Sequence, residues 1–188
     1  MNIFFLPNKK LSDEELIRAC QRQDPKAQRM MYERFAPKML GVCRRYIQRL
    51  EIAEEMLSNG FVKLFRNLDQ YQHKGSFEGW IRQIMVRECL DHIKVQKGIW
   101  LDIDSMPEQQ ERSDNFSTDH DVNLQELLEL VDTLPPGYRT VFNLYALEGY
   151  KHHEIGTELG ISENTSKTQL MKARELLQKR YAEQYNEN

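Results

Sequence analysis

Residues 152–174, HHEIGTELGISENTSKTQLMKAR, predict a short helix, a glycine turn and a second helix. Ile155 and Leu159 lie four residues apart, so they share one face of the first helix. Gly160 ends that helix, because glycine tolerates the left-handed conformation found at helix C-termini. Ser162 is a favourable N-cap for the second helix. The stretch therefore predicts a helix-turn-helix.

The second helix separates an inward stripe from an outward face. The inward stripe comprises Ser166, Leu170, Ala173 and Leu177, and the outward face comprises Asn164, Lys167, Thr168, Met171 and Lys172. In helix-turn-helix proteins the first turns of the second helix contact base edges in the major groove, and Lys, Thr and Asn suit that contact. Helical hairpins with a glycine turn also occur without DNA binding, so the rest of the chain must decide between the two interpretations.

Charge is distributed unevenly along the 188 residues. The net charge of −3 argues against a protein that binds nucleic acid by bulk electrostatics. Residues 1–95 carry a net charge of +5, residues 96–121 of −5, and residues 122–188 of −3. The acidic middle is rich in Asp, Glu, Gln, Ser and Asn and has no helical periodicity, which is typical of an extended linker.

The domain organisation follows from this linker. We expect an all-α protein of two small helical domains, residues 1–95 and 122–188, joined by the flexible acidic linker 96–121. The rear domain would be a bundle that contains the helix-turn-helix. In the front domain we expect helices almost throughout, broken at Asp24-Pro25, near Pro37 and at residues 70–76.

The cysteine pattern and the hydropathy exclude two classes of protein. Cys20, Cys43 and Cys89 lie far apart, without metal-ligand spacing, so we expect buried, reduced thiols. No apolar run approaches the ~20 residues of a membrane span, and the start NIFFLP lacks the basic region of a signal peptide. We therefore expect a cytoplasmic protein.

Residues 71–94, YQHKGSFEGWIRQIMVRECLDHIK, join a polar loop to a helix that carries one tryptophan and several cations. Aromatic rings can stack on unpaired bases while Arg and Lys hold the phosphates, so this mixture favours single-stranded nucleic acid. The competing interpretation is that the Trp80 ring is partly buried among Ile81, Ile84 and Met85.

With these motifs in place, the whole chain resembles an extracytoplasmic-function sigma factor, a member of the sigma-70 family of bacterial RNA polymerase. The most specific motifs are LPPGYRTVFNLYALEGYKHHEIGTELGISENTSKTQLMKAREL (134–176), similar to the family's region four, and GSFEGWIRQIMVRECLDHIK (75–94), similar to the end of its region two. The resemblance implies an initiation factor that binds core RNA polymerase, recognises the promoter minus-thirty-five element with its helix-turn-helix, and melts the minus-ten element. It implies no enzymatic activity, no cofactor and no metal.

The resemblance also implies roles for particular residues. Minus-thirty-five recognition would fall to Lys167, Thr168, Met171 and Lys172, with phosphate contacts from Arg139 and Arg174. Minus-ten contacts would fall to Tyr71, His73, Trp80, Arg82, Arg87 and Lys94, with Tyr71 and His73 stacking on a flipped base. Polymerase contacts would fall to Glu54, Glu55, Ser58, Asn59, Phe61, Val62 and Phe65. Phe61 and Phe65 are four residues apart and also suit the core, so Glu54, Glu55 and Asn59 are the best candidates of this set.

Three residues depart from the family pattern. Ser166 and Gln169 stand where the family usually has a β-branched apolar residue and an arginine, and Arg87 stands where asparagine is common. Ser166 could donate a hydrogen bond to a carbonyl one turn back. The sequence preference of the family therefore does not transfer to this chain.

Two other classes of function remain open on the sequence. A stand-alone helix-turn-helix regulator would bind duplex DNA as a dimer, whereas a sigma factor would be monomeric when free. A metal enzyme would rest on His152, His153 and Glu154, but adjacent helical residues point in different directions. The family often has an anti-sigma partner as well. The sequence shows neither that partner, the promoters nor the inducing signal.

Overall fold

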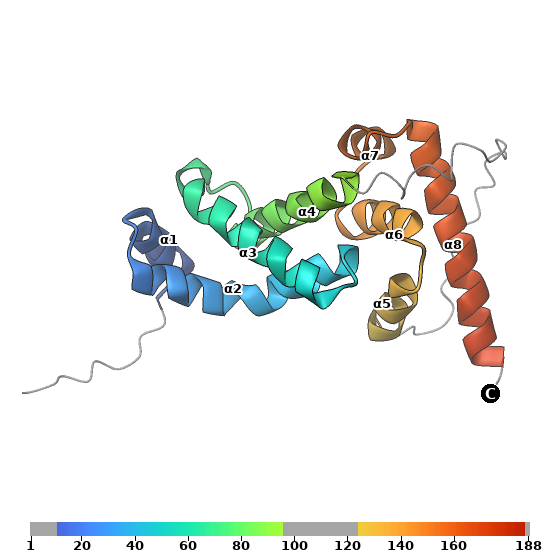
Figure 1. The fold of residues 1–188 in the computed structure, drawn as a ribbon, viewed down its shortest axis with the longest axis horizontal. Coiled ribbons are helices and arrows are strands. Elements are labelled where there is room, and N and C mark those ends of the chain that lie inside the picture. Colours follow the sequence, from blue (N-terminus) through green and yellow to red (C-terminus); the bar gives the residue numbers. More distant parts are fainter. Residues whose placement is uncertain (1–10, 96–123, 187–188) are drawn as a thin grey trace, which may run out of the picture. The chain divides into compact units, whose positions relative to one another are not determined.

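The computed structural model describes residues 11–95 and 124–186, and within these ranges the regular structure is entirely helical, as expected (Figure 1). The elements are, in order, α1 (Asp13–Gln21), α2 (Pro25–Tyr46), α3 (Leu50–Arg66), η1 (Leu68–Gln70), α4 (Phe77–Val95), α5 (Leu124–Asp132), α6 (Pro136–Phe142), η2 (Asn143–Leu147), α7 (His152–Leu159) and α8 (Glu163–Asn186). The chain divides into two compact units, Met1–Cys89 and Leu90–Asn188. The whole of the expected linker 96–121 lies outside the described residues.

The first helices of the front unit begin where the sequence signals them. Ser12 forms a capping box, in which its hydroxyl accepts from the Glu15 N–H and its own N–H donates to the Glu15 carboxylate at 2.8 Å. Asp24 caps α2 by accepting from the Lys26 N–H at 2.8 Å, and Pro25 occupies the first helical position.

The expected break near Pro37 is wrong, because α2 continues through the proline as far as Tyr46. Pro37 is exposed, while Phe35, Ala36 and Met39 beside it are buried. The carbonyl that loses its donor belongs to Glu33 on the exposed side of the helix, where water can reach it. Burial of the neighbouring side chains therefore outweighs the local cost of the proline.

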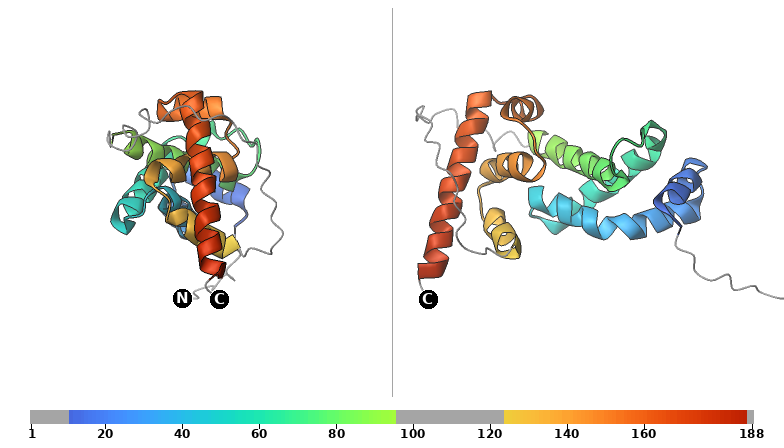
Figure 2. Two further views of the ribbon diagram at one scale, coloured as in Figure 1. Left: turned by 90° about the vertical axis from the view of Figure 1, so that its right-hand side faces the viewer. Right: turned by 180° about the vertical axis from the view of Figure 1, so that it is seen from behind.

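The core of the front unit forms where α2 and α3 pack side by side (Figures 1 and 2). Its methionines fill the interior: Met31, Met39 and Met85 are each 1% exposed or less. The three cysteines are free and buried, as expected. No helix in the part of the chain that the structure describes is long and apolar enough to span a membrane.

The rear unit is organised around α8. In Figure 1 and in the right-hand view of Figure 2, α5, α6 and α7 lie along one side of this long helix. A core cluster of Val131, Leu134, Ala173 and Leu177 joins α5 to the middle of α8. The start of α8 stays outside this cluster and packs against α7.

Candidate nucleic-acid interface

The turn between α7 and α8 has the conformation that the sequence predicts. Gly160 has φ +69°, and Ser162 accepts a hydrogen bond from the Thr165 N–H at 2.9 Å. The Ile161 N–H donates to the carbonyl of Gly156 at 3.1 Å. A Cβ on Gly156 would lie only 2.8 Å from the carbonyl oxygen of Ile161, so the close approach involves the backbone of the turn. These contacts fix how α8 follows α7.

The helix α8 buries the expected stripe and presents the expected face. Its inward residues Ser166, Leu170, Ala173 and Leu177 are all 5% exposed or less. Its outward candidates Lys167, Thr168, Met171 and Lys172 are half-buried. Two of them are paired with carboxylates on the same helix, Lys167 with Glu163 at 3.3 Å and Lys172 with Glu175 at 3.0 Å. We call Lys167, Thr168, Met171 and Lys172 the reading face.

Of the two expected phosphate contacts, only Arg174 is accessible. Arg139 is 3% exposed, and its guanidinium donates to the carbonyl of Asp132 at 3.1 Å and of Leu134 at 3.3 Å. Burial lowers the pKa of Arg139, and Asp132 opposes that shift. Arg139 is therefore a structural residue that satisfies the carbonyls at the end of α5, and its expected contact with DNA is wrong. Arg174 is exposed, with its Cζ 5.7 Å from the ring centroid of Tyr145.

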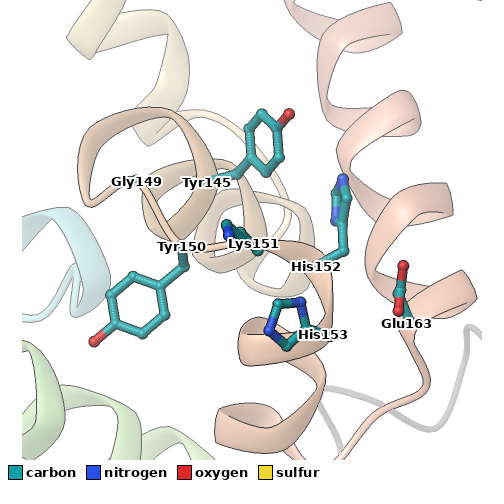
Figure 3. A pocket seen from close by; sticks show the side chains of 7 residues that line it. All are labelled: Tyr145, Gly149, Tyr150, Lys151, His152, His153 and Glu163. Carbon is teal, nitrogen blue, oxygen red and sulfur yellow. The ribbon is translucent and has the colours of Figure 1, made fainter.

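An open pocket of about 500 Å³ lies beside the start of α7 (Figure 3). It is lined by Tyr145, Gly149, Tyr150, Lys151, His152, His153 and Glu163. Figure 3 shows Tyr145 and His152 next to each other, with Glu163 entering from the start of α8. The two rings stack with centroids 4.7 Å apart and planes at 22°. On its other side His152 reaches α8, where its Nδ1 lies 2.9 Å from the Ser166 hydroxyl oxygen.

His152 should titrate below its ordinary pKa of 6.5. Burial lowers its pKa, Lys167 and Arg174 lower it further, and Glu163 opposes them. The pKa of His152 is lower in the folded chain than in the unfolded chain, so the unfolded chain binds more protons near that pH. The contribution of neutral His152 to the free energy of unfolding is therefore fully present above pH 6.5 and is lost as the pH falls from 6.5 through the folded pKa. An NMR titration of the imidazole, assigned with His152→Asn, should give a midpoint below 6.5. A midpoint at or above that value would contradict the buried, cationic environment.

His152, His153 and Glu154 do not converge as metal ligands would. His152 faces Ser166, His153 is exposed, and the Glu154 carboxylate accepts from the Lys151 N–H at 2.7 Å. Within residues 11–95 and 124–186, no three His, Cys, Asp or Glu residues are grouped so that they could hold a metal ion.

The front unit brings four rings together around the loop before α4. Tyr71 contacts His73, Phe77 and Trp80 at centroid distances of 4.7, 5.1 and 5.3 Å, and its hydroxyl donates to the carbonyl of Gly75. Tyr71 is only 9% exposed, so the expectation that it offers a free stacking surface is wrong. His73 is exposed, and Trp80 is half-buried as the competing interpretation expected. Phe77, to which the sequence assigned no role, is 5% exposed and packs against Tyr71 and Trp80.

The cations of α4 do not form one row. Arg87 and Lys94 are exposed and seven residues apart, which places them on the same face of the helix. Arg82 is half-buried, and five residues separate it from Arg87, so it lies on another side.

The expected polymerase-binding residues separate by burial. Glu54, Glu55, Ser58, Asn59 and Val62 are exposed on α3. Phe61 is 3% exposed and packs against Tyr32 and Phe65, so it is a core residue, and its expected polymerase contact is wrong. Phe65 is half-buried. Tyr32 of α2 packs against Phe61 and is 40% exposed, so it adds an aromatic ring to the surface beside this face. The sequence did not single it out, because it lies off the apolar stripe of its own helix.

Two family models match this chain, one mainly in the front unit and one in the rear unit. A model described as Sigma-70 region 2 matches residues 31–99, and one described as Sigma-70, region 4 matches residues 124–177. The ECF RNA polymerase sigma-E factor of Haemophilus influenzae is 23% identical over 179 residues, covering 89% of this chain and 94% of that protein. The ECF RNA polymerase sigma factor SigE of Mycolicibacterium smegmatis is 30% identical over 131 residues, covering 66% of this chain and 50% of that protein.

The sigma factor RpoE from Bartonella quintana, in complex with the anti-sigma factor NepR, is similar with a TM-score of 0.46 and 15% identity, covering 80% of this chain and 94% of that one.

Proposed function

This chain belongs to the sigma-70 family, in its group of extracytoplasmic-function sigma factors, and from that premise we propose how its surfaces divide the work of promoter-directed transcription initiation. As an initiation factor it binds core RNA polymerase and directs it to promoters. The presence of both regions in one chain carries this function, because a stand-alone dimeric regulator would leave the front unit without a role. The two domains would be residues 1–95 and 122–188, with 96–121 as the linker.

The reading face of α8 would recognise the minus-thirty-five element. Lys167 and Lys172 can donate to guanine edges or to phosphates, Thr168 can bond to a base edge, and Met171 can contact thymine methyl groups. Arg174, exposed one turn further along, would hold a phosphate. Arg139 has no part in this contact because its guanidinium is committed to carbonyls inside the unit.

The loop before α4 would capture the melted minus-ten element. His73 and the accessible part of Trp80 would offer surfaces for unpaired bases, while Tyr71 packs against both rings. Arg87 and Lys94 would follow the backbone of the opened strand, and Arg82 would contact it from another side. Opening the duplex on this scheme uses binding energy alone, without a chemical step.

The exposed face of α3 would dock on core polymerase. It combines the acids Glu54 and Glu55 with Ser58, Asn59 and the 48% exposed Val62. Half-buried Phe65 extends the apolar part of this face. Such a combination of exposed apolar and polar side chains is typical of protein interfaces.

Removing the polar part of this face should weaken polymerase binding without affecting the fold. We expect the triple variant Glu54→Ala, Glu55→Ala, Asn59→Ala to bind core polymerase about tenfold or more weakly, because all three side chains are exposed and none supports the core. Fluorescence titration of labelled chain with core polymerase measures the affinity. The control Glu14→Ala, Asp69→Ala removes the same two charges from elsewhere in the unit and should bind normally. Equal affinities for both variants would refute this docking face.

The function itself is tested by transcription in vitro. Purified core polymerase is given a pool of genomic promoter fragments with and without the full chain, and transcripts are mapped. New discrete start sites support the proposal. If the polymerase makes no new transcripts and the chain alone binds duplex DNA in a mobility-shift assay, the dimeric regulator would be favoured.

We further propose that the free chain is a cytoplasmic monomer and that an anti-sigma protein covers its polymerase-facing surfaces. NepR, bound to RpoE of Bartonella quintana, is an anti-sigma factor of that protein. Purification of this chain from resting cells tests the second part. Recovery of polymerase subunits alone would count against an inhibitor.

A further inference from the structure

Four side chains link the recognition helix to the elements beside it. Tyr145 belongs to η2, His152 begins α7, and Ser166 and Arg174 both belong to α8. The contacts run from Ser166 to His152, from His152 to Tyr145, and from Tyr145 to Arg174. The chain of contacts is therefore attached to α8 at two positions, Ser166 and Arg174. We call these four residues the brace.

The brace begins and ends on either side of the reading face. Ser166 precedes Lys167 and Arg174 follows Lys172, so the two attachment points are separated by about 12 Å along the helix. An attachment at each end restrains both the rotation and the tilt of the segment between them. A rotation of 100° would replace each residue of the reading face by its neighbour in sequence.

A local irregularity of the backbone places Tyr145 where the brace needs it. Residues Asn143–Leu147 form a π-helical turn, in which the Glu148 N–H donates to the Asn143 carbonyl at 3.1 Å. Asn143 and Leu144 are fully buried, while Tyr145 is 37% exposed. Such turns recur at functional sites in proteins. Here the turn holds two residues in the core and presents the next ring to His152 and Arg174.

The brace adds little to the core of the unit. The cluster of Val131, Leu134, Ala173 and Leu177 joins α5 to α8 without any of its members. Tyr145 is 37% exposed and His152 half-buried, so their removal takes apolar contacts from the edge of the unit and leaves this cluster intact. Ser166 differs, because it is fully buried and its hydroxyl finds its partner in His152. The expected hydrogen bond to a carbonyl one turn back is replaced by this contact.

We infer that Tyr145 and His152 are positioning residues for minus-thirty-five recognition: His152 orients the start of the reading face through Ser166, and Tyr145 orients the Arg174 guanidinium toward a DNA phosphate. The inference rests on the proposed function, because it requires that α8 reads the upstream element. It predicts that both residues act on promoter affinity through α8, without a contact of their own to the bases.

The test uses holoenzyme made from core polymerase and the full chain. One DNA probe is a promoter fragment recovered with the wild-type chain, and the second is the same fragment with its minus-thirty-five segment scrambled. Tyr145→Ala and His152→Ala should each weaken binding to the intact fragment about tenfold and leave binding to the scrambled fragment unchanged. Tyr145→Phe, which keeps the ring, and Thr157→Ala, an exposed position of α7 outside the brace, should bind as the wild type does. Thermal unfolding of each variant checks the fold.

Double variants test the coupling even where a single variant loses stability. The losses of His152→Ala and Ser166→Ala should not add, and neither should those of Tyr145→Ala and Arg174→Ala, because each pair acts as one unit. Fully additive losses, or equal losses on intact and scrambled fragments, would overturn the inference. A wild-type holoenzyme that binds both fragments equally would instead refute minus-thirty-five reading itself, and the inference would fall with it.

Discussion

Gly156→Val is expected to destabilise the helix-turn-helix by on the order of 3 kcal/mol and to abolish promoter-directed transcription. The first added carbon alone would lie 2.8 Å from the carbonyl oxygen of Ile161. That oxygen belongs to the backbone of the turn, so it cannot move aside as the end of a flexible side chain would. For a small domain this loss lowers the unfolding midpoint by roughly 12 °C or more. Circular dichroism melting and in vitro transcription measure the two effects.

Gly41→Val is the matched control, because it makes the same chemical change in a helix with open space around it. Apart from the neighbouring residues and backbone of its own helix, no atom lies within 4 Å of a Cβ at Gly41. Valine has a slightly higher helix propensity than glycine, so the midpoint should change by only about 2 °C there. A Gly156→Val chain that melts and transcribes like Gly41→Val would mean that the turn can relax away from α7.

The double variant Lys167→Ala, Lys172→Ala should lose at least about 100-fold in holoenzyme affinity for its promoters. Both lysines lie on the reading face, where each could contact a base edge or a phosphate. If both contact phosphates, the slope of log affinity against log salt should fall by about 2. Filter binding at several salt concentrations and abortive transcription on the same fragment measure both quantities.

Lys26→Ala, Lys179→Ala controls for charge. It removes the same two positive charges from exposed positions outside the reading face. Affinity and salt slope should stay close to those of the wild type. Retention of full promoter affinity by the Lys167→Ala, Lys172→Ala chain would place the upstream contact on a different surface.

The helix-turn-helix could be predicted closely because its signals are local. Gly160 supplies the left-handed residue, Ser162 caps the next helix, and the spacing of Leu170, Ala173 and Leu177 defines the buried stripe. Each of these depends on neighbours within one or two turns. The same holds for the capping box at Ser12.

The burial of a side chain could not be predicted where it depends on contacts with residues outside its own helix. Arg139 is buried because the carbonyls at the end of α5 need donors, and Tyr71 is buried because Phe77 and Trp80 fold back over it. In sequence, Tyr71 stands among polar residues and Arg139 is itself a cation, so both suggest exposure. Ser166 is another case, since its partner His152 lies fourteen residues away, across the turn. Burial could be predicted only for residues that the helical spacing places on an apolar stripe.

The two lysines of the reading face are already paired before any DNA arrives. Lys167 lies 3.3 Å from the Glu163 carboxylate, and Lys172 lies 3.0 Å from that of Glu175. A DNA phosphate that binds either lysine must first displace its carboxylate partner. Each ion pair contributes ~0.3–0.5 kcal/mol, so the affinity for DNA of random sequence falls about twofold for each lysine. Most DNA sequences that a promoter-reading protein meets are not promoters. If the reading face contacts DNA as proposed, Glu163 and Glu175 would therefore shorten the time that the chain stays bound to sequences that are not promoters.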